Sequence, residues 1–159
     1  MEQYMFTRST KLCFSLMLCT VLFSATPGLA ADGPMAAQSS ETPLVAIMIN
    51  DKTVQVEYAV TFAQRAVGLM NRPSLCQQCG MLFKFANPKM ASMWMKNTLI
   101  PLDVAFIRSD GVITDISPLQ PHDLTSVGAS ENVLYALEMN QGWFTKNGIA
   151  VGDTLHIQP

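Results

Sequence analysis

The stretch LDVAFIRSDGVITDI, residues 102–116, decides the fold class. Two runs rich in aliphatic and aromatic residues flank Ser109, Asp110 and Gly111, which are turn-forming residues. Runs of this length on either side of such a turn predict a β-hairpin. The neighbouring segments have the same short, apolar character, so the sequence predicts a domain built mainly from strands.

Other strands are predicted on both sides of this hairpin, and few helices separate them. Thr61, with Gln64 three residues later, forms a capping-box pattern that predicts a short helix ending near Gly68, and residues 142–147 predict one more helical turn. The absence of long helices excludes a parallel α/β sheet. We expect a mainly β fold, an antiparallel sandwich or barrel-like domain with one or two short helices. The other predicted strands are 44–49, 53–58, 80–85, 91–96, 133–139 and 154–157.

Two interruptions are expected within this pattern. Asn87 and Pro88 should separate the strand at 80–85 from the strand at 91–96, because proline cannot donate a ladder hydrogen bond. Residues 117–132 contain Pro118, Pro121 and Gly128 and show no periodicity. They predict a long loop, which is a candidate lid or rim for a binding site.

The first thirty residues read as an export signal. Arg8 and Lys11 precede an apolar segment, residues 12–25, that is too short to span a bilayer comfortably, and Gly28 and Ala30 occupy the small-residue positions of a cleavage site. We therefore expect a signal peptide at 1–30, a flexible tether at 31–42 and a single β-rich domain at 43–159. The predicted location is the periplasm or another extracytoplasmic compartment.

The net charge and the hydropathy of the chain limit the classes of partner that it can bind. The chain has ten basic and twelve acidic residues, a net charge of −2, and loss of the signal would leave the mature protein slightly more acidic. This balance argues against nucleic acid as a partner. After cleavage no remaining apolar stretch approaches membrane-spanning length, so we expect no membrane association. The oligomeric state is left open.

Two cysteines, Cys76 and Cys79 in CQQC, follow the predicted signal. Export makes a disulfide the default state of such a pair. A redox-active CxxC should lie between a strand and a helix, whereas here turn-forming residues precede the pair and the strand-like GMLFKF follows it. We interpret the pair as a structural bridge, with thiol–disulfide chemistry as the alternative.

Several polar residues stand in segments that otherwise read as protein interior. Unpaired charges are costly to bury, so such residues should be paired or should face a cleft. Period-two alternation places Glu138 on the face of Ala136, and Trp94 with Lys96 on the face opposite Met95 and Asn97. Arg65 is suited to holding one of the two carboxylates. The candidate ligand-binding residues are Arg65, Trp94, Lys96, Asn97, Asp103 and Glu138.

An ordered series of motifs resembles a known family. The sequence is similar to the uncharacterised family named domain of unknown function 192, and the resemblance implies a small, mainly β domain that is frequently exported and has no established activity. It implies no catalytic residues. The CQQC insert and the methionines Met90 and Met93 depart from the common pattern of the family. The motifs are RAVGLM from Arg65, GMLF from Gly80, WMKNT from Trp94, PLD from Pro101, LEMNQG from Leu137, and Gly152 with Asp153.

Three functions fit these observations. The first is a binding or accessory domain whose cleft near residues 94–103 takes a small polar or glycan-like ligand without a cofactor; a purely structural network of the same polar residues is its alternative. The second is Cu(I) binding through Met90, Met93 and Met95, because thioethers select soft metals. The third is an enzyme that uses the cysteine pair, or Asp103 and Glu138 as acid and base. No nucleophile paired with a histidine is visible.

Overall fold

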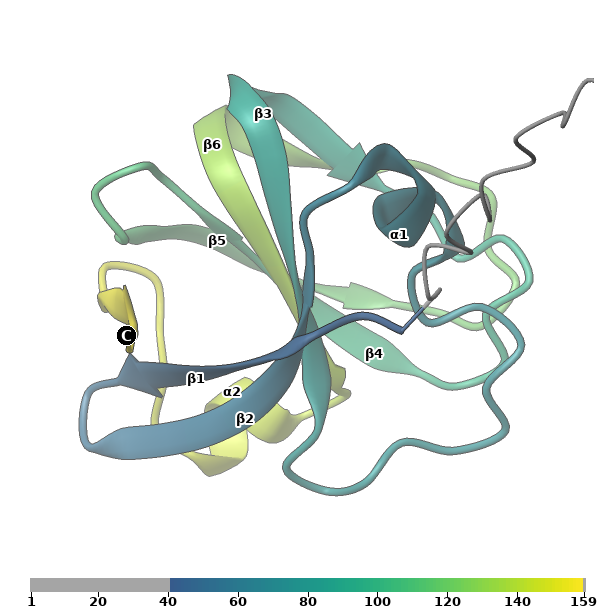
Figure 1. Cartoon of the computed structure of the whole chain (residues 1–159), viewed down its shortest axis with the longest axis horizontal. Helices are drawn as coiled ribbons and strands as arrows, with labels where there is room; N and C mark the ends of the chain where they lie inside the picture. The colour runs from purple at the N-terminus through teal and green to yellow at the C-terminus, as the bar shows by residue number, and fades with distance from the viewer. Residues whose placement is uncertain (1–40, 159) are drawn as a thin grey trace, which may run out of the picture. The chain divides into compact units, whose positions relative to one another are not determined.

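The computed structural model describes residues 41–158, whose seven strands form one sheet curled into a half-barrel (Figure 1). The prediction of a mainly β fold, an antiparallel sandwich or barrel-like domain with one or two short helices, is confirmed in its barrel-like form, except that the sheet is mixed. The strand order is β5-β4-β6-β3-β2-β1-β7, and only β2 and β3 run parallel. The elements are β1 (Leu44–Ile49), β2 (Lys52–Ala59), α1 (Phe62–Val67), β3 (Gly80–Met93), β4 (Leu102–Ile107), β5 (Ile113–Leu119), β6 (Val127–Asn140), α2 (Trp143–Lys146) and β7 (Leu155–Ile157).

Local chemistry explains the start of α1. The Thr61 hydroxyl accepts a hydrogen bond from the Gln64 backbone N–H at 3.2 Å, and the Gln64 side chain accepts one from the Thr61 N–H at 3.0 Å. This reciprocal capping box satisfies two backbone donors that the first turn of the helix leaves free. The helix ends at Gly68, whose φ of 50° lies in the region that favours glycine. The predicted helix and its cap are confirmed.

The expected break at Asn87 and Pro88 is wrong, because residues 80–93 form one continuous strand. The register between β3 and β6 shifts between Lys84 and Lys89, so that residues 85–88 stand opposite residue 134 alone. Pro88 lies within this bulge, where a missing N–H removes no ladder bond. The strand then ends at Met93, and the segment 94–101 is irregular rather than extended.

The expected long loop at 117–132 is also wrong. β5 continues to Leu119 and β6 begins at Val127, which leaves only residues 120–126 as a connection. β5 forms an edge of the sheet, where a strand tolerates Pro118. The connection is tied down, since the Met95 N–H donates to the Asp123 carbonyl at 2.8 Å and the His122 N–H donates to the Thr98 carbonyl at 3.1 Å.

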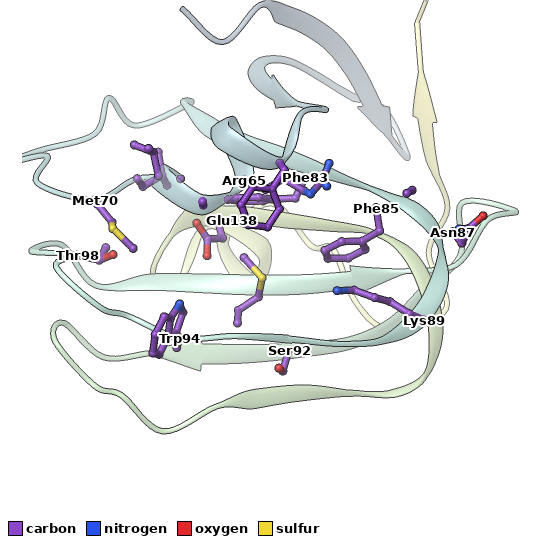
Figure 2. A pocket seen from close by; sticks show the side chains of 17 residues that line it. Arg65, Met70, Phe83, Phe85, Asn87, Lys89, Ser92, Trp94, Thr98 and Glu138 are labelled. Atoms are coloured by element: carbon purple, nitrogen blue, oxygen red, sulfur yellow. The ribbon is translucent and has the colours of Figure 1, made fainter. Parts of the chain in front are cut away.

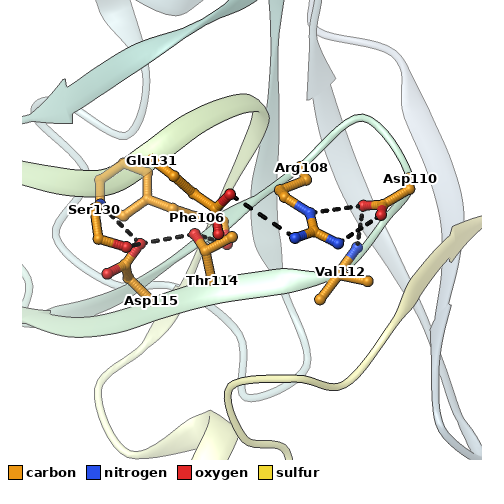
Figure 3. Close-up of polar contacts among 8 residues, drawn as sticks. All are labelled: Phe106, Arg108, Asp110, Val112, Thr114, Asp115, Ser130 and Glu131. Carbon is orange, nitrogen blue, oxygen red and sulfur yellow. Dashed lines mark hydrogen bonds and ion pairs between the residues drawn. The ribbon is translucent and has the colours of Figure 1, made fainter.

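Polar contacts hold the amino-terminal half of β6 against β5. The Asp115 carboxylate accepts hydrogen bonds from the Ser130 N–H and hydroxyl, both at 3.0 Å, and from the Thr114 hydroxyl at 2.7 Å (Figure 3). Burial opposes ionisation of this carboxyl, but the bonds outweigh it and lower the pKa of Asp115. Nearby, Arg108 bonds to Asp110 at 2.6 Å in the turn after β4.

The two faces of the sheet bury separate cores. Along β4, the side chains of Leu102, Val104 and Phe106 enter one core, and those of Ala105 and Ile107 enter the other. We call these core A and core B. Core A consists of the buried residues Ala59, Leu69, Met81, Phe83, Phe85, Ala91, Met95, Ile100, Leu102, Val104, Phe106, Leu119, Ala129, Val133 and Ala136. Core B contains Leu82, Leu137 and Met139 with Trp143 and Phe144 of α2, among others.

The predicted signal peptide at 1–30 and most of the predicted tether lie outside the described residues. Within residues 41–158, no helix has the length and apolar character needed to cross a membrane.

Candidate functional site

A cavity of about 550 Å³ lies on the core A side of the sheet, beside α1. Its walls come from α1 and the residues after it, from β3 on both sides of the bulge, and from the irregular segment that follows β3 (Figure 2). Most of the lining is apolar, as in many small-molecule sites. The lining side chains used below are Phe62, Arg65, Ala66, Met70, Phe83, Phe85, Lys89, Met93, Trp94, Thr98 and Glu138.

Glu138 is the buried carboxyl of this cavity. In the sheet it lies between Val104 of β4 and Met81 of β3, both of which belong to core A, and it is only 4% exposed. Within residues 41–158, its carboxyl takes part in no hydrogen bond and no ion pair, and Figure 2 shows it pointing into the space that the lining side chains surround. Desolvation raises the pKa of Glu138 to about 8. The group is therefore mostly protonated at neutral pH.

Arg65 does not hold a carboxylate, contrary to the expected pairing. Its Nη1 donates to two backbone carbonyl oxygens, that of Val60 at 2.6 Å and that of Lys84 at 2.8 Å. These bonds connect α1 to the end of β2 and to β3. Arg65 still lines the cavity, and its two bonds to backbone carbonyls hold its side chain in place.

The segment after β3 contributes two residues to the cavity. Trp94 is half-exposed and Thr98 is buried, and both line it. Lys96 and Asn97 do not: the Lys96 Nζ lies 5.5 Å from the centroid of the Trp94 ring, and Asn97 has a φ of 55° and accepts a bond from the Asn71 N–H at 2.8 Å. The alternation expected for a strand at 91–96 fails here, because the strand ends at Met93.

Asp103 lies on the opposite face of the sheet. Its neighbours on that face are Ala105 of β4 and Met139 of β6, both in core B, and its carboxylate accepts a bond from the Gly142 N–H at 2.7 Å. The structure thus places Asp103 outside the cavity and away from Glu138. The sheet itself separates the two carboxyls, so they do not form the acid and base pair that a glycosidase requires.

The methionines of the copper alternative occupy three environments. Met90 is 61% exposed, Met93 lines the cavity, and Met95 is fully buried in core A. This arrangement gives no support to a shared thioether site. In the part of the chain that the structure describes, no three His, Cys, Asp or Glu residues are grouped as metal ligands would be.

Cys76 and Cys79 form a disulfide whose Cα atoms are 5.0 Å apart. The loop they close is fixed to the end of β6 and to α2, because Asn140 Nδ2 donates to the Cys76 carbonyl at 2.7 Å and Trp143 Nε1 donates to Gln78 Oε1 at 3.0 Å. The pair precedes β3 and lies in no βα turn. The geometry supports the interpretation as a structural bridge.

Several lining residues were missed at the level of the sequence. Phe83 and Phe85 share a face of β3 by simple alternation, so the pattern GMLFKF contained the signal for both. Lys89 continues the same alternation, but the expected break at Asn87 and Pro88 separated it from that strand. Phe62 gave no such signal, because it is an 81% exposed aromatic residue at the start of α1.

Fold and cavity together define a small β half-barrel that carries a partly apolar, ligand-sized pocket beside one short helix. The chain belongs to the family domain of unknown function 192, described as "Uncharacterized ACR", whose model matches residues 45–157. This confirms the resemblance seen in the motifs.

The solved structures that are similar to the chain include the following two. One, from Sinorhizobium meliloti 1021, is described as a "putative transcription regulator"; it is 36% identical, with a TM-score of 0.71, over 74% of this chain and 95% of that one. The other, a protein of unknown function from Novosphingobium aromaticivorans DSM 12444, is 35% identical, with a TM-score of 0.67, over 71% of this chain and 84% of that one. Comparison with curated proteins found no match.

Proposed function

We propose that this chain is an extracytoplasmic binding domain that takes a small, partly apolar ligand in the cavity beside α1. The observation that carries the proposal is Glu138, a carboxyl that is 4% exposed, without a partner in the described chain, and part of the cavity wall. Among the described residues no side-chain oxygen is both sealed from solvent and unpaired, so the carboxyl of Glu138 reaches the space of the cavity. A ligand in that space can supply the partner that the described chain does not, and it offsets the cost of holding a carboxyl in an apolar wall.

The cost of Glu138 to the fold strengthens this argument. A pKa raised from 4.5 to about 8 means that the fold holds an acid where an apolar residue would be more stable at neutral and alkaline pH. Asp103 shows that the same sheet can satisfy a carboxylate with a backbone N–H when the role is structural. Binding sites commonly contain a residue that lowers the stability of the fold and is kept for its function.

The size and composition of the cavity fit a small ligand. Pockets for small molecules measure roughly 300–1,000 Å³ and have mainly apolar walls with a few polar groups. The cavity falls in this range at about 550 Å³, and its polar side chains are those of Arg65, Asn87, Lys89, Ser92, Thr98 and Glu138. The description of one relative as a transcription regulator does not enter the proposal, because a net charge of −2 gives little attraction to a phosphate backbone.

A fragment screen by ligand-observed NMR would test the proposal, with one pair of variants as a built-in control. Ala66 and Ala63 are both exposed on α1, but only Ala66 lines the cavity. We expect Ala66→Phe to abolish binding of the fragments that the wild-type protein takes, and Ala63→Phe and Asp103→Asn to retain it. Fragments that bind all variants alike, or no fragment binding at all, would contradict the proposal.

A further inference from the structure

The chemistry of the cavity also indicates what its ligand carries, and this step rests on the function proposed above. We infer that the ligand is an organic cation, an ammonium group on an apolar body, whose charge meets the Glu138 carboxylate while the body lies against the aromatic walls.

Glu138 is the only acidic residue among those that line the cavity, and the two basic ones, Arg65 and Lys89, keep their positive charges but direct them to other groups of the protein. Arg65, from α1, gives its Nη1 to the carbonyls of Val60 and Lys84. Lys89, from β3, holds its Nζ 4.6 Å from the centroid of the Phe85 ring. Neither forms an ion pair with Glu138 in the described chain. Once ionised, Glu138 therefore has no counter-charge within the described chain, and a cationic ligand would supply one.

The aromatic walls favour the same class of ligand. Phe62, Phe83, Phe85 and Trp94 all line the cavity, and a cation is attracted to the face of an aromatic ring. Two of these rings already attract ammonium groups of the protein, since Lys89 lies over Phe85 and Lys96 lies over Trp94. Aromatic rings that surround one carboxyl group are suited to a ligand that carries an amine on a hydrocarbon skeleton.

Proton linkage supplies a quantitative signature. The carboxyl must lose its proton before it can pair with a cation, and with a pKa of about 8 it is mostly protonated at pH 7 and mostly ionised at pH 9. The affinity for an amine that stays protonated over this range should rise about tenfold from pH 7 to pH 9. A neutral ligand that accepts the carboxyl proton in a hydrogen bond should show the opposite trend. The other titratable groups that line the cavity are Arg65 and Lys89.

Three probes of matched size and shape distinguish these cases: 3-phenylpropylamine, 3-phenylpropan-1-ol and 3-phenylpropanoate. Titration calorimetry on the purified protein at pH 7 and pH 9 should show that the amine binds best. Its affinity should rise about tenfold with pH, should fall at least tenfold in Glu138→Gln, and should then no longer depend on pH. Ala66→Phe should block the amine, and Ala63→Phe should not.

The outcomes separate this inference from the function on which it rests. If the alcohol or the carboxylate binds as tightly as the amine and Ala66→Phe blocks it, the cationic ligand is wrong while the binding site stands. Unchanged amine affinity in Glu138→Gln would also overturn the inference. If none of the three binds the wild-type protein, the inference falls, and the fragment screen with Ala66→Phe and Ala63→Phe decides separately whether the cavity binds ligands.

Discussion

Glu138 and Asp103 occupy adjacent rungs of the same pair of strands, yet their environments differ completely. Glu138 pairs with Val104, and Asp103 pairs with Met139 one residue along β6. The alternation of side chains across a strand sends the two carboxyls to opposite faces. Asp103 meets a backbone N–H donor from Gly142, whereas Glu138 meets a cavity. One step along a strand thus separates a carboxylate that pairs with the backbone from a carboxyl that faces the cavity.

The raised pKa of Glu138 predicts an unusual pH dependence of stability. The folded state keeps the proton up to about pH 8, whereas the unfolded chain releases it near 4.5. The contribution to stability is therefore fully present below 4.5, declines as the pH rises, and is lost once the pH passes about 8. We expect Glu138→Gln to be more stable than the wild-type protein at pH 9, by a few kcal/mol as an order of magnitude, and close to it at pH 4.

Urea unfolding of both proteins at several pH values would check this prediction. Asp103→Asn is the matched control, because it removes a charge from the neighbouring rung without touching the cavity. Stability curves of wild type and Glu138→Gln that run parallel from pH 4 to pH 9 would show that the carboxyl of Glu138 ionises freely in the folded protein.

At the scale of the elements, β3 supplies side chains to the cavity wall along most of its length. Its first half supplies Phe83 and Phe85, and the part that follows the bulge supplies Lys89 and Met93. The strand begins with Gly80, which pairs with Met139 next to Glu138. A Cβ built on Gly80 would lie 2.4 Å from the Glu138 carbonyl oxygen and 2.2 Å from the Met139 sulfur. The start of β3 therefore packs too closely against β6 to accept a side chain.

We expect Gly80→Ala to destabilise the domain by about 1–3 kcal/mol or more, because the backbone of β6 must shift to admit the methyl group. Gly128, also in a strand of this sheet, is the control: its added Cβ would meet only the Ala91 carbonyl oxygen, at 3.8 Å. Gly128→Ala should leave the free energy of unfolding unchanged or raise it slightly. Equal effects of the two substitutions in urea titrations would rule out this account of the Gly80 contact.

The disulfide loop should contribute stability rather than chemistry. Closing so small a ring removes little freedom from the unfolded chain, worth about 2 kcal/mol in the chain-entropy estimate. We expect the double variant Cys76→Ser, Cys79→Ser to lose about this much stability while keeping the affinity of the cavity, since neither cysteine lines it. Catalysed disulfide exchange on a test substrate by the wild-type protein, absent in the variant, would instead support the redox alternative.

At the scale of the molecule, a single curled sheet separates two cores and leaves the cavity on one side only. Core B packs beneath α2, while on the core A side α1 buries none of its own residues, and the space beside it stays open as the cavity. The short helix thus borders the site instead of sealing it. This chain belongs to a family without an assigned activity, and the cavity beside α1 is where we propose that it binds a ligand.

The proposed location outside the cytoplasm depends on removal of the first thirty residues. We expect protein isolated from a periplasmic extract to begin at Ala31, because Gly28 and Ala30 present small side chains to the signal peptidase. Intact-mass measurement would show this. Ala30→Arg, which replaces the small residue at the cleavage position, should accumulate as the uncleaved form. Wild-type protein that retains residues 1–30 would contradict the predicted export and cleavage.

The sequence by itself determined what depends on neighbours in the chain. The hairpin turns, the capping box at Thr61, the pairing of Cys76 with Cys79 and the face on which Glu138 lies follow from local spacing, and the structure agrees with each. Of the six candidate site residues, Arg65, Trp94 and Glu138 line the cavity. All three were found because polar or large aromatic side chains stood in apolar segments.

Only the tertiary structure decided what depends on partners far along the chain. The parallel pairing of β2 with β3, the continuity of β3 through Pro88 and the backbone acceptors of Arg65 are set by contacts between separate segments. Lys96 and Asn97 do not line the cavity. The sequence placed them by the side-chain alternation of a strand, but β3 ends at Met93, so that alternation does not apply to them. A periodic pattern states which residues share a face, but the element packed against that face determines whether it meets a core, a cavity or solvent.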